Sequence, residues 1–110
     1  MSPLQEKKKI KESSTSGYGI VRNPYPHYPS PNEKIDFKNL YNIGQMWLRF
    51  EGSFKDGNKE GPGNIYLTNG HLFSGTFKKD LAEGRGGVFY QGKTLLKGIW
   101  RNNILVTKFE

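Results

Sequence analysis

Apolar and polar residues alternate along three short stretches in the second half of the chain, residues 47–54, 72–77 and 95–100. Such a period of two is typical of a strand with one buried and one solvated face. In the first stretch, the pattern places Leu48, Phe50, Gly52 and Phe54 on one face, and Trp47, Arg49, Glu51 and Ser53 on the other. The other two stretches repeat this order, so we predict three equivalent strands.

Turn-forming pairs separate these stretches. Asp56-Gly57 and Asn69-Gly70 are strong hairpin signals, because both central residues of a type I′ turn have positive φ. A third reversal is predicted near Gln91-Gly92. Residues 47–107 are therefore expected to form antiparallel β-structure without a helix longer than about one turn.

The stretches belong to a repeat whose copies begin at Phe50, Phe73 and Leu96, an offset of 23 residues (73 − 50 and 96 − 73). Each first half carries a bulky apolar residue, a glycine and an aromatic residue at alternate positions. Residues 60–66 and 83–89 align as second halves, with Glu-Gly-x-Gly and a final aromatic residue. Agreement at spaced positions predicts a recurring core, formed by Phe50, Gly52, Phe54, Tyr66, Phe73, Gly75, Phe77, Phe89, Leu96, Gly98 and Trp100.

Glycine recurs at Gly52, Gly75 and Gly98, although a glycine inside a strand costs stability. Three glycines at equivalent positions therefore need a structural reason. We expect each missing side chain to let an aromatic ring from a neighbouring strand lie flat over the backbone.

The pattern aromatic-x-Gly-x-aromatic, followed by Glu-Gly-x-Gly, resembles the MORN (membrane occupation and recognition nexus) repeat. Residues 50–72 and 73–95 resemble two full copies, and residues 96–105 resemble the first strand of a third. Phenylalanine stands where the family most often has tyrosine or tryptophan, and Leu96 is aliphatic, but these changes keep the apolar role. The resemblance implies an all-β fold, a single antiparallel β-meander sheet of MORN hairpins over residues 47–110.

The first 46 residues contain no such repeat. Residues 1–16 are charged and then rich in Ser and Thr, which predicts a flexible tail. Residues 17–31 hold four prolines and should be polyproline-like or irregular. Residues 33–46 predict a short helical turn that caps the domain and ends at Gly44.

Residues 17–31 are more apolar than a solvated linker needs, and two interpretations stay open; as a docking arm, the segment extends over residues 17–46. The segment is either part of a disordered tail or an extended Pro/Tyr-rich arm that docks on its own domain or on another protein. In the second case the arm is a partner-binding segment, because tyrosine provides contact area at modest entropic cost. Its candidate partner-binding residues are Tyr18, Ile20, Val21, Tyr25, Tyr28, Phe37 and Tyr41.

Charge and composition limit the kinds of partner. Lys and Arg outnumber Asp and Glu by 17 to 10, which favours acidic partners. Within the tail, anionic lipid is a candidate ligand of Lys7, Lys8, Lys9 and Lys11. No recognition helix or known module indicates sequence-specific nucleic-acid binding. The chain lacks cysteine, and no apolar run approaches the ~18 residues of a membrane-spanning helix.

We expect no catalytic, cofactor or metal site and hence no enzyme. His27 and His71 are distant in sequence, and a shared turn conformation explains Glu60 and Glu83 better than an acid–base pair. As a family, MORN proteins serve as scaffold components, many of them in cilia and in cytoskeletal or membrane-associated assemblies. The resemblance implies an adaptor subunit, with the cytoplasm and the ciliary axoneme or another cytoskeletal complex as its location. The alternatives are a peripheral membrane adaptor that binds anionic phospholipid through the basic tail, and a regulatory module of a longer enzyme.

Overall fold

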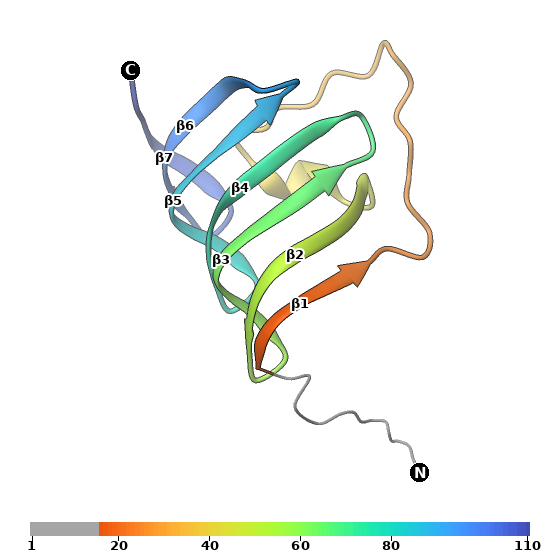
Figure 1. Cartoon of the computed structure of the whole chain (residues 1–110). Coiled ribbons are helices and arrows are strands. Elements are labelled where there is room, and N and C mark those ends of the chain that lie inside the picture. Colours follow the sequence, from red (N-terminus) through yellow and green to blue (C-terminus); the bar gives the residue numbers. More distant parts are fainter. Residues whose placement is uncertain (1–15) are drawn as a thin grey trace.

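The computed structural model describes residues 16–110 (Figure 1). Within them, seven strands form one open antiparallel sheet in chain order, so every strand pairs with its neighbours in the sequence. The elements are β1 (Gly17–Arg22), the 3₁₀ turn η2 (Leu40–Ile43), β2 (Trp47–Lys55), β3 (Asn58–Leu67), β4 (His71–Lys78), β5 (Leu81–Tyr90), β6 (Lys93–Arg101) and β7 (Ile104–Lys108). The predicted all-β meander is confirmed. So is the short helical turn, which ends at Gly44 with φ of 53°.

β1 corrects one expectation about the arm. Residues 17–22 do not adopt polyproline-like or irregular backbone but pair with β2 without a register shift, from Gly17 opposite Phe54 to Arg22 opposite Arg49. The first part of the arm therefore belongs to the sheet. The residues that follow it, 23–46, form no strand before β2 begins (Figure 1).

The three predicted reversals are present, and their geometry follows from backbone φ. Asp56 and Gly57 have φ of 52° and 82°, and Gln91 and Gly92 have 51° and 79°, as a type I′ turn requires. The type I′ prediction is wrong at Asn69-Gly70, where only Gly70 has positive φ. There, the Gly70 amide donates to the Leu67 carbonyl at 3.2 Å.

Two further reversals, at Lys79-Asp80 and Asn102-Asn103, carry no glycine signal. All four residues have φ between 49° and 73°, and both turns occupy the repeat position of Asp56-Gly57, at offsets of 23 and 46 residues. Asp80, Asn102 and Asn103 are residue types that adopt positive φ more readily than most, and the alignment of the repeat places them at equivalent turns.

Glycines form a continuous row across six strands. The register places Gly19 opposite Gly52 and continues from strand to strand through Gly63, Gly75, Gly86 and Gly98. The rings over Gly52 and Gly75 come from the same strand as the glycine, Phe50 on β2 and Phe73 on β4, and not from a neighbouring strand as expected. Each ring also lies over the facing glycine of the next strand, Gly63 or Gly86. A Cβ on Gly75 would stand 2.9 Å from Phe73 Cζ, and a Cβ on Gly86 would stand 2.8 Å from the same atom. At Gly98 the three nearest atoms belong not to a ring but to Leu105 and the backbone of Thr107 on β7.

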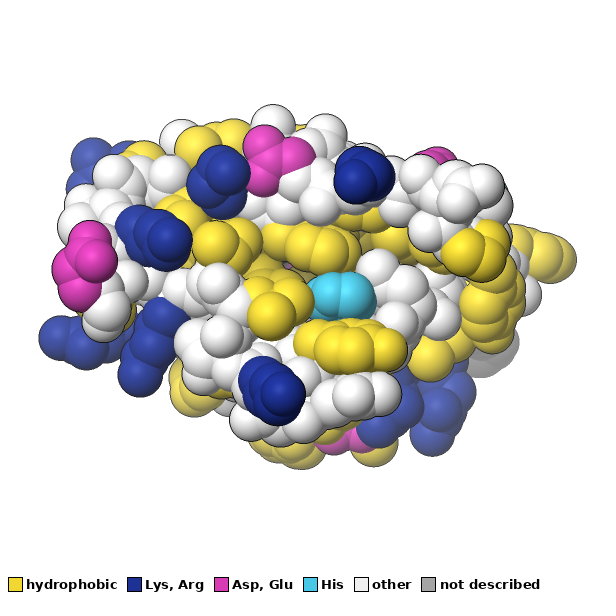
Figure 2. Space-filling model, turned by 90° about the horizontal axis from the view of Figure 1, so that it is seen from above, with side chains coloured by type: hydrophobic (Ala, Val, Ile, Leu, Met, Phe, Trp, Pro, Cys, Tyr) yellow, Lys and Arg dark blue, Asp and Glu magenta, His cyan; other side chains and the backbone are white. Residues whose placement is uncertain are grey.

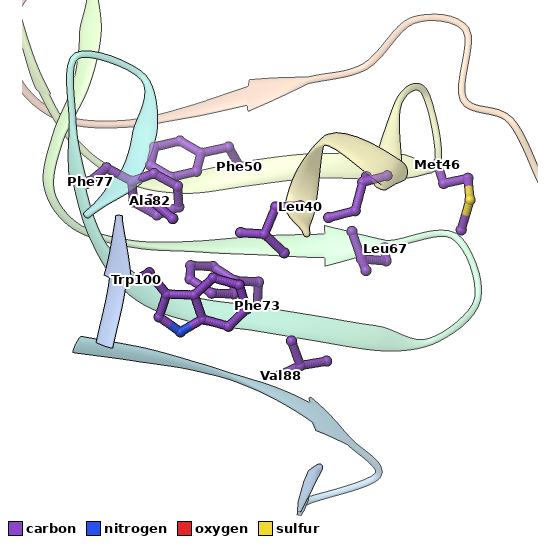
Figure 3. Packing of buried hydrophobic residues seen from close by; sticks show 10 residues of the cluster. Leu40, Met46, Phe50, Leu67, Phe73, Phe77, Ala82, Val88 and Trp100 are labelled. Atoms are coloured by element: carbon purple, nitrogen blue, oxygen red, sulfur yellow. The ribbon is translucent and has the colours of Figure 1, made fainter. Parts of the chain in front are cut away.

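The core lies on one face of the sheet, which we call the covered face because residues 35–46 lie across it. Leu40, Ile43 and Met46 from this segment are buried against strand residues (Figure 3). Figure 3 shows Leu40 between Phe50 and Phe73. The buried strand residues are Phe50, Leu67, Phe73, Phe77, Ala82, Val88 and Trp100. Phe54 and Leu96 are partly buried against them.

A register shift between Trp47 and Arg49 reverses the predicted faces at the start of β2. Trp47 packs on the core, whereas Leu48 lines a groove on the other side of the sheet, the opposite face. A bulge has this effect because an extra residue breaks the alternation. Two predicted core residues, Tyr66 and Phe89, also line that groove and are half-buried outside the core cluster.

Candidate interaction surfaces

Recurrent hydrogen bonds tie each repeat to the next. Glu60 Oε1 accepts a hydrogen bond from the Lys79 amide at 3.2 Å, and Glu83 Oε1 accepts one from the Asn102 amide at the same distance. In return, Asp80 Oδ1 accepts from the Lys59 amide at 2.8 Å. The two glutamates therefore hold the turns of the following repeat, as the structural interpretation predicted.

The arm after β1 is anchored through its backbone. The Asn23 amide donates to the Leu48 carbonyl at 2.9 Å, and the His27 amide donates to the Gln45 carbonyl at 2.7 Å. The Thr68 hydroxyl donates to the His27 carbonyl at 2.7 Å. These contacts order the arm without burying its tyrosines, since Tyr25 keeps 85% of its surface exposed.

The structure places the predicted partner-binding residues in two groups. Phe37 is partly buried on the core, and its ring centroid lies 4.8 Å from that of His71. Six others are exposed on β1, along the arm and on η2: Tyr18, Ile20, Val21, Tyr25, Tyr28 and Tyr41.

A groove on the opposite face was not foreseen from the sequence. Its volume is about 610 Å³, and its apolar lining includes Leu48, Tyr66, Leu72 and Phe89. The guanidinium of Arg49 lies 3.8 Å from the Tyr66 ring centroid and pairs with Glu51 at 2.7 Å. That hydrogen bond raises the pKa of Arg49. The sequence signal for this groove was one apolar residue in each of β3, β4 and β5 on the face away from the core, namely Tyr66, Leu72 and Phe89.

His71 lies at the end of the sheet between two aromatic rings. Its centroid is 4.6 Å from that of Tyr90, its cross-strand partner, and Phe37 lies on its other side. Burial lowers the pKa of His71 below its ordinary value, and a hydrogen bond involving Asn69 opposes this only in part. His71 therefore packs between its cross-strand partner Tyr90 and Phe37. Figure 2 views this end of the molecule, where hydrophobic side chains gather around a histidine.

Residues 16–110 contain no group of three or more His, Asp or Glu residues placed to hold a metal ion. None of the helices described is long and apolar enough to span a membrane. The basic run Lys7–Lys11 lies outside the described residues.

One open sheet of recurring hairpins, with interlocked turns and a glycine row, defines a β-meander repeat protein. The MORN repeat family model matches residues 50–72 and 73–91. Residues 50–91 therefore consist of two MORN repeats, which confirms the resemblance seen in the sequence. The MORN repeat is a non-catalytic module for interaction with proteins or membrane lipids. No curated protein matches the chain.

Proposed function

We propose that this protein is a non-catalytic adaptor subunit of a larger protein assembly, and that the arm forms its principal partner surface. The observation that carries the proposal is the exposure of the arm tyrosines on an anchored backbone. Tyr25 and Tyr28 are 85% and 63% exposed, while the chain around them is held by hydrogen bonds to β2 and Thr68. Aromatic side chains on ordered backbone bind with a reduced entropic cost.

Charge supports a protein partner with acidic groups. The chain carries a formal net charge of +7, and a protein of opposite charge would associate faster with it. For the assembly itself we propose the ciliary axoneme or another cytoskeletal complex. This part of the proposal follows from the functions common among MORN proteins.

The test is capture from native extract with the full chain as bait. A Tyr25→Ser, Tyr28→Ser double variant should recover its specific partners at least about fivefold less than the unaltered bait, because both rings leave the interface. Val106→Ser is the matched control, since Val106 is also exposed, at 55%, but lies on β7. Equal recovery with both variants would contradict the arm as partner surface. Recovery of axonemal or other cytoskeletal proteins would support the assembly, and its absence would contradict it.

Anionic lipid is the alternative ligand. Sedimentation with vesicles of phosphatidylserine and phosphatidylcholine, compared between low and high salt, distinguishes it, because contacts through exposed lysines weaken as salt screens them. Salt-sensitive sedimentation that disappears when Lys7, Lys8, Lys9 and Lys11 are changed to Gln would favour the membrane adaptor. The adaptor proposal expects no such binding.

A further inference from the structure

β1 has the sequence and backbone of the second strand of a repeat. Its Gly-x-Gly-x-Val pattern at residues 17–21 matches Gly-x-Gly-x-Ile at 61–65 and Gly-x-Gly-x-Val at 84–88. The first glycine of each has positive φ, 107° at Gly17, 90° at Gly61 and 99° at Gly84. A shared pattern with a shared special conformation indicates the same structural position.

The pairing with the following strand is also the same. Gly17 lies opposite Phe54, as Gly61 lies opposite Phe77. Two residues further, Gly19 faces Gly52 in the same way that Gly63 faces Gly75. β1 is therefore the second half of a repeat that precedes the two matched ones.

In a complete repeat, the first strand supplies a ring that covers the glycine of the second. Phe73 from β4 covers Gly86 of β5 in this way, with its Cζ 2.8 Å from a Cβ built there. Among residues 16–110, no strand lies on the outer side of β1 to supply such a ring to Gly19. The nearest atoms to a Cβ on Gly19 belong to Phe54 of β2, at 3.4 Å and 3.6 Å. The Phe54 ring thus leaves the Cβ position of Gly19 open, whereas the Phe73 ring fills the equivalent position at Gly86.

The outer edges of β1 and β7 differ. At β7, Ile104 forms a bridge with Asn39, and the Leu105 amide donates to the Lys38 carbonyl at 2.8 Å. No strand of residues 16–110 pairs with the outer edge of β1, which lies at one side of the sheet in Figure 1. β1 also lacks proline, lysine and a bulge, the features that usually prevent strand addition.

We propose that the outer edge of β1 binds an antiparallel strand of another protein that carries an aromatic-x-Gly motif. In the complex, the partner's glycine lies opposite Gly19 and its aromatic residue opposite Val21, so that the ring covers both glycines. Residues 1–15 contain neither an aromatic residue nor a glycine and do not supply this motif. The strands of this chain that do supply it, β2 and β4, are paired on both sides. This inference rests on the proposed adaptor function and names a second contact and its chemistry.

The probe is a synthetic peptide with the sequence of residues 71–79, which contains Phe73 and Gly75 in the required spacing. Titrated into the full chain labelled with ¹⁵N, it should shift the amide resonances of β1. A peptide with Phe73→Ala should bind about tenfold more weakly or worse, because it lacks the ring. Gly19→Ala in the protein should weaken binding of the unaltered peptide to a similar extent, since the methyl group would occupy the space for the ring. Thr107→Ala, on the β7 edge, is the matched control and should change nothing.

Three results would overturn the inference. The first is no binding, or binding that is independent of the peptide's ring. The second is a shift pattern centred on β3 and β5, which would show that the peptide replaces β4. The third is a dimer of the unliganded chain, measured by light scattering, that Gly19→Ala or Ile20→Lys dissociates, because the edge would then belong to a second copy. If the peptide fails but the arm variants still reduce capture from extract, the adaptor function stands and only the strand-pairing inference falls.

Discussion

Gly75→Ala tests the packing of rings over glycines, because a single methyl group would meet three atoms at once. Its Cβ would stand 2.8 Å from Gly86 Cα, 2.9 Å from the Arg85 carbonyl oxygen and 2.9 Å from Phe73 Cζ. Two of these atoms are backbone. The ring has little freedom to move away, since Phe73 is fully buried and packs edge-on against Trp100 at 5.0 Å.

The expected magnitude combines two opposing terms. Overpacking of this kind costs about 1–3 kcal/mol. Replacing glycine by alanine restricts the unfolded chain and returns ~0.4–1 kcal/mol. The free energy of unfolding should therefore fall by roughly 1–2 kcal/mol, and the melting temperature by roughly 5–15 °C for a domain of this size.

Gly19→Ala is the matched control, because Gly19 belongs to the same glycine row but its Cβ would meet Phe54 only at ordinary contact distances, 3.4 Å and 3.6 Å. Its stability should stay unchanged or rise by up to ~1 kcal/mol. Urea denaturation of both variants, followed by tryptophan fluorescence, gives the midpoints, and equal m-values make them comparable. Equal midpoints, or a lower midpoint for Gly19→Ala, would refute the close packing at Gly75.

Three further predictions concern other parts of the fold. Burial lowers the pKa of His71 in the folded protein, so the unfolded chain binds more protons at pH values between that pKa and about 6.5. Stability should therefore fall as the pH drops below about 6.5. The melting temperatures at pH 7.5 and pH 5.5 should differ less for His71→Phe than for the unaltered protein. Asp80→Ala should lower the free energy of unfolding, measured in denaturant melts, by about 1–2 kcal/mol, because the variant loses the hydrogen bond from the Lys59 amide and alanine disfavours the positive φ. Asp80→Asn should be close to neutral, since Asn103 fills the equivalent position in the next repeat. Leu40→Ala should cost ~2–5 kcal/mol by the same measurement, as Leu40 is only 6% exposed, and a loss below ~1 kcal/mol would contradict its role in covering the sheet.

The sequence by itself determined the elements that depend on neighbouring residues and on the repeat. Alternation predicted the strands at residues 47–54, 72–77 and 95–100, and Asp56-Gly57 predicted a type I′ turn. The 23-residue offset predicted that Phe50 and Phe73 are equivalent core residues. These predictions succeed because alternation and turn conformation are local properties of the chain. The candidate partner residues Tyr25 and Tyr28 were also visible as aromatic residues in a proline-rich segment, and their binding role stays a prediction.

Tertiary structure decided the features that depend on where distant segments meet. The bulge at Leu48 changed which of two adjacent apolar residues faces the core, and no local pattern shows where an extra residue is absorbed. Likewise, Tyr66 recurs in the repeat as a core residue would, yet it lines the groove on the opposite face. The pairing of β1 with β2 joins segments separated by residues 23–46, so the pattern Gly-x-Gly-x-Val at Gly17 gains its meaning only from the register it adopts. A single strand cannot specify its partner, because its hydrogen-bonding groups are the same in every strand and only packing selects among them.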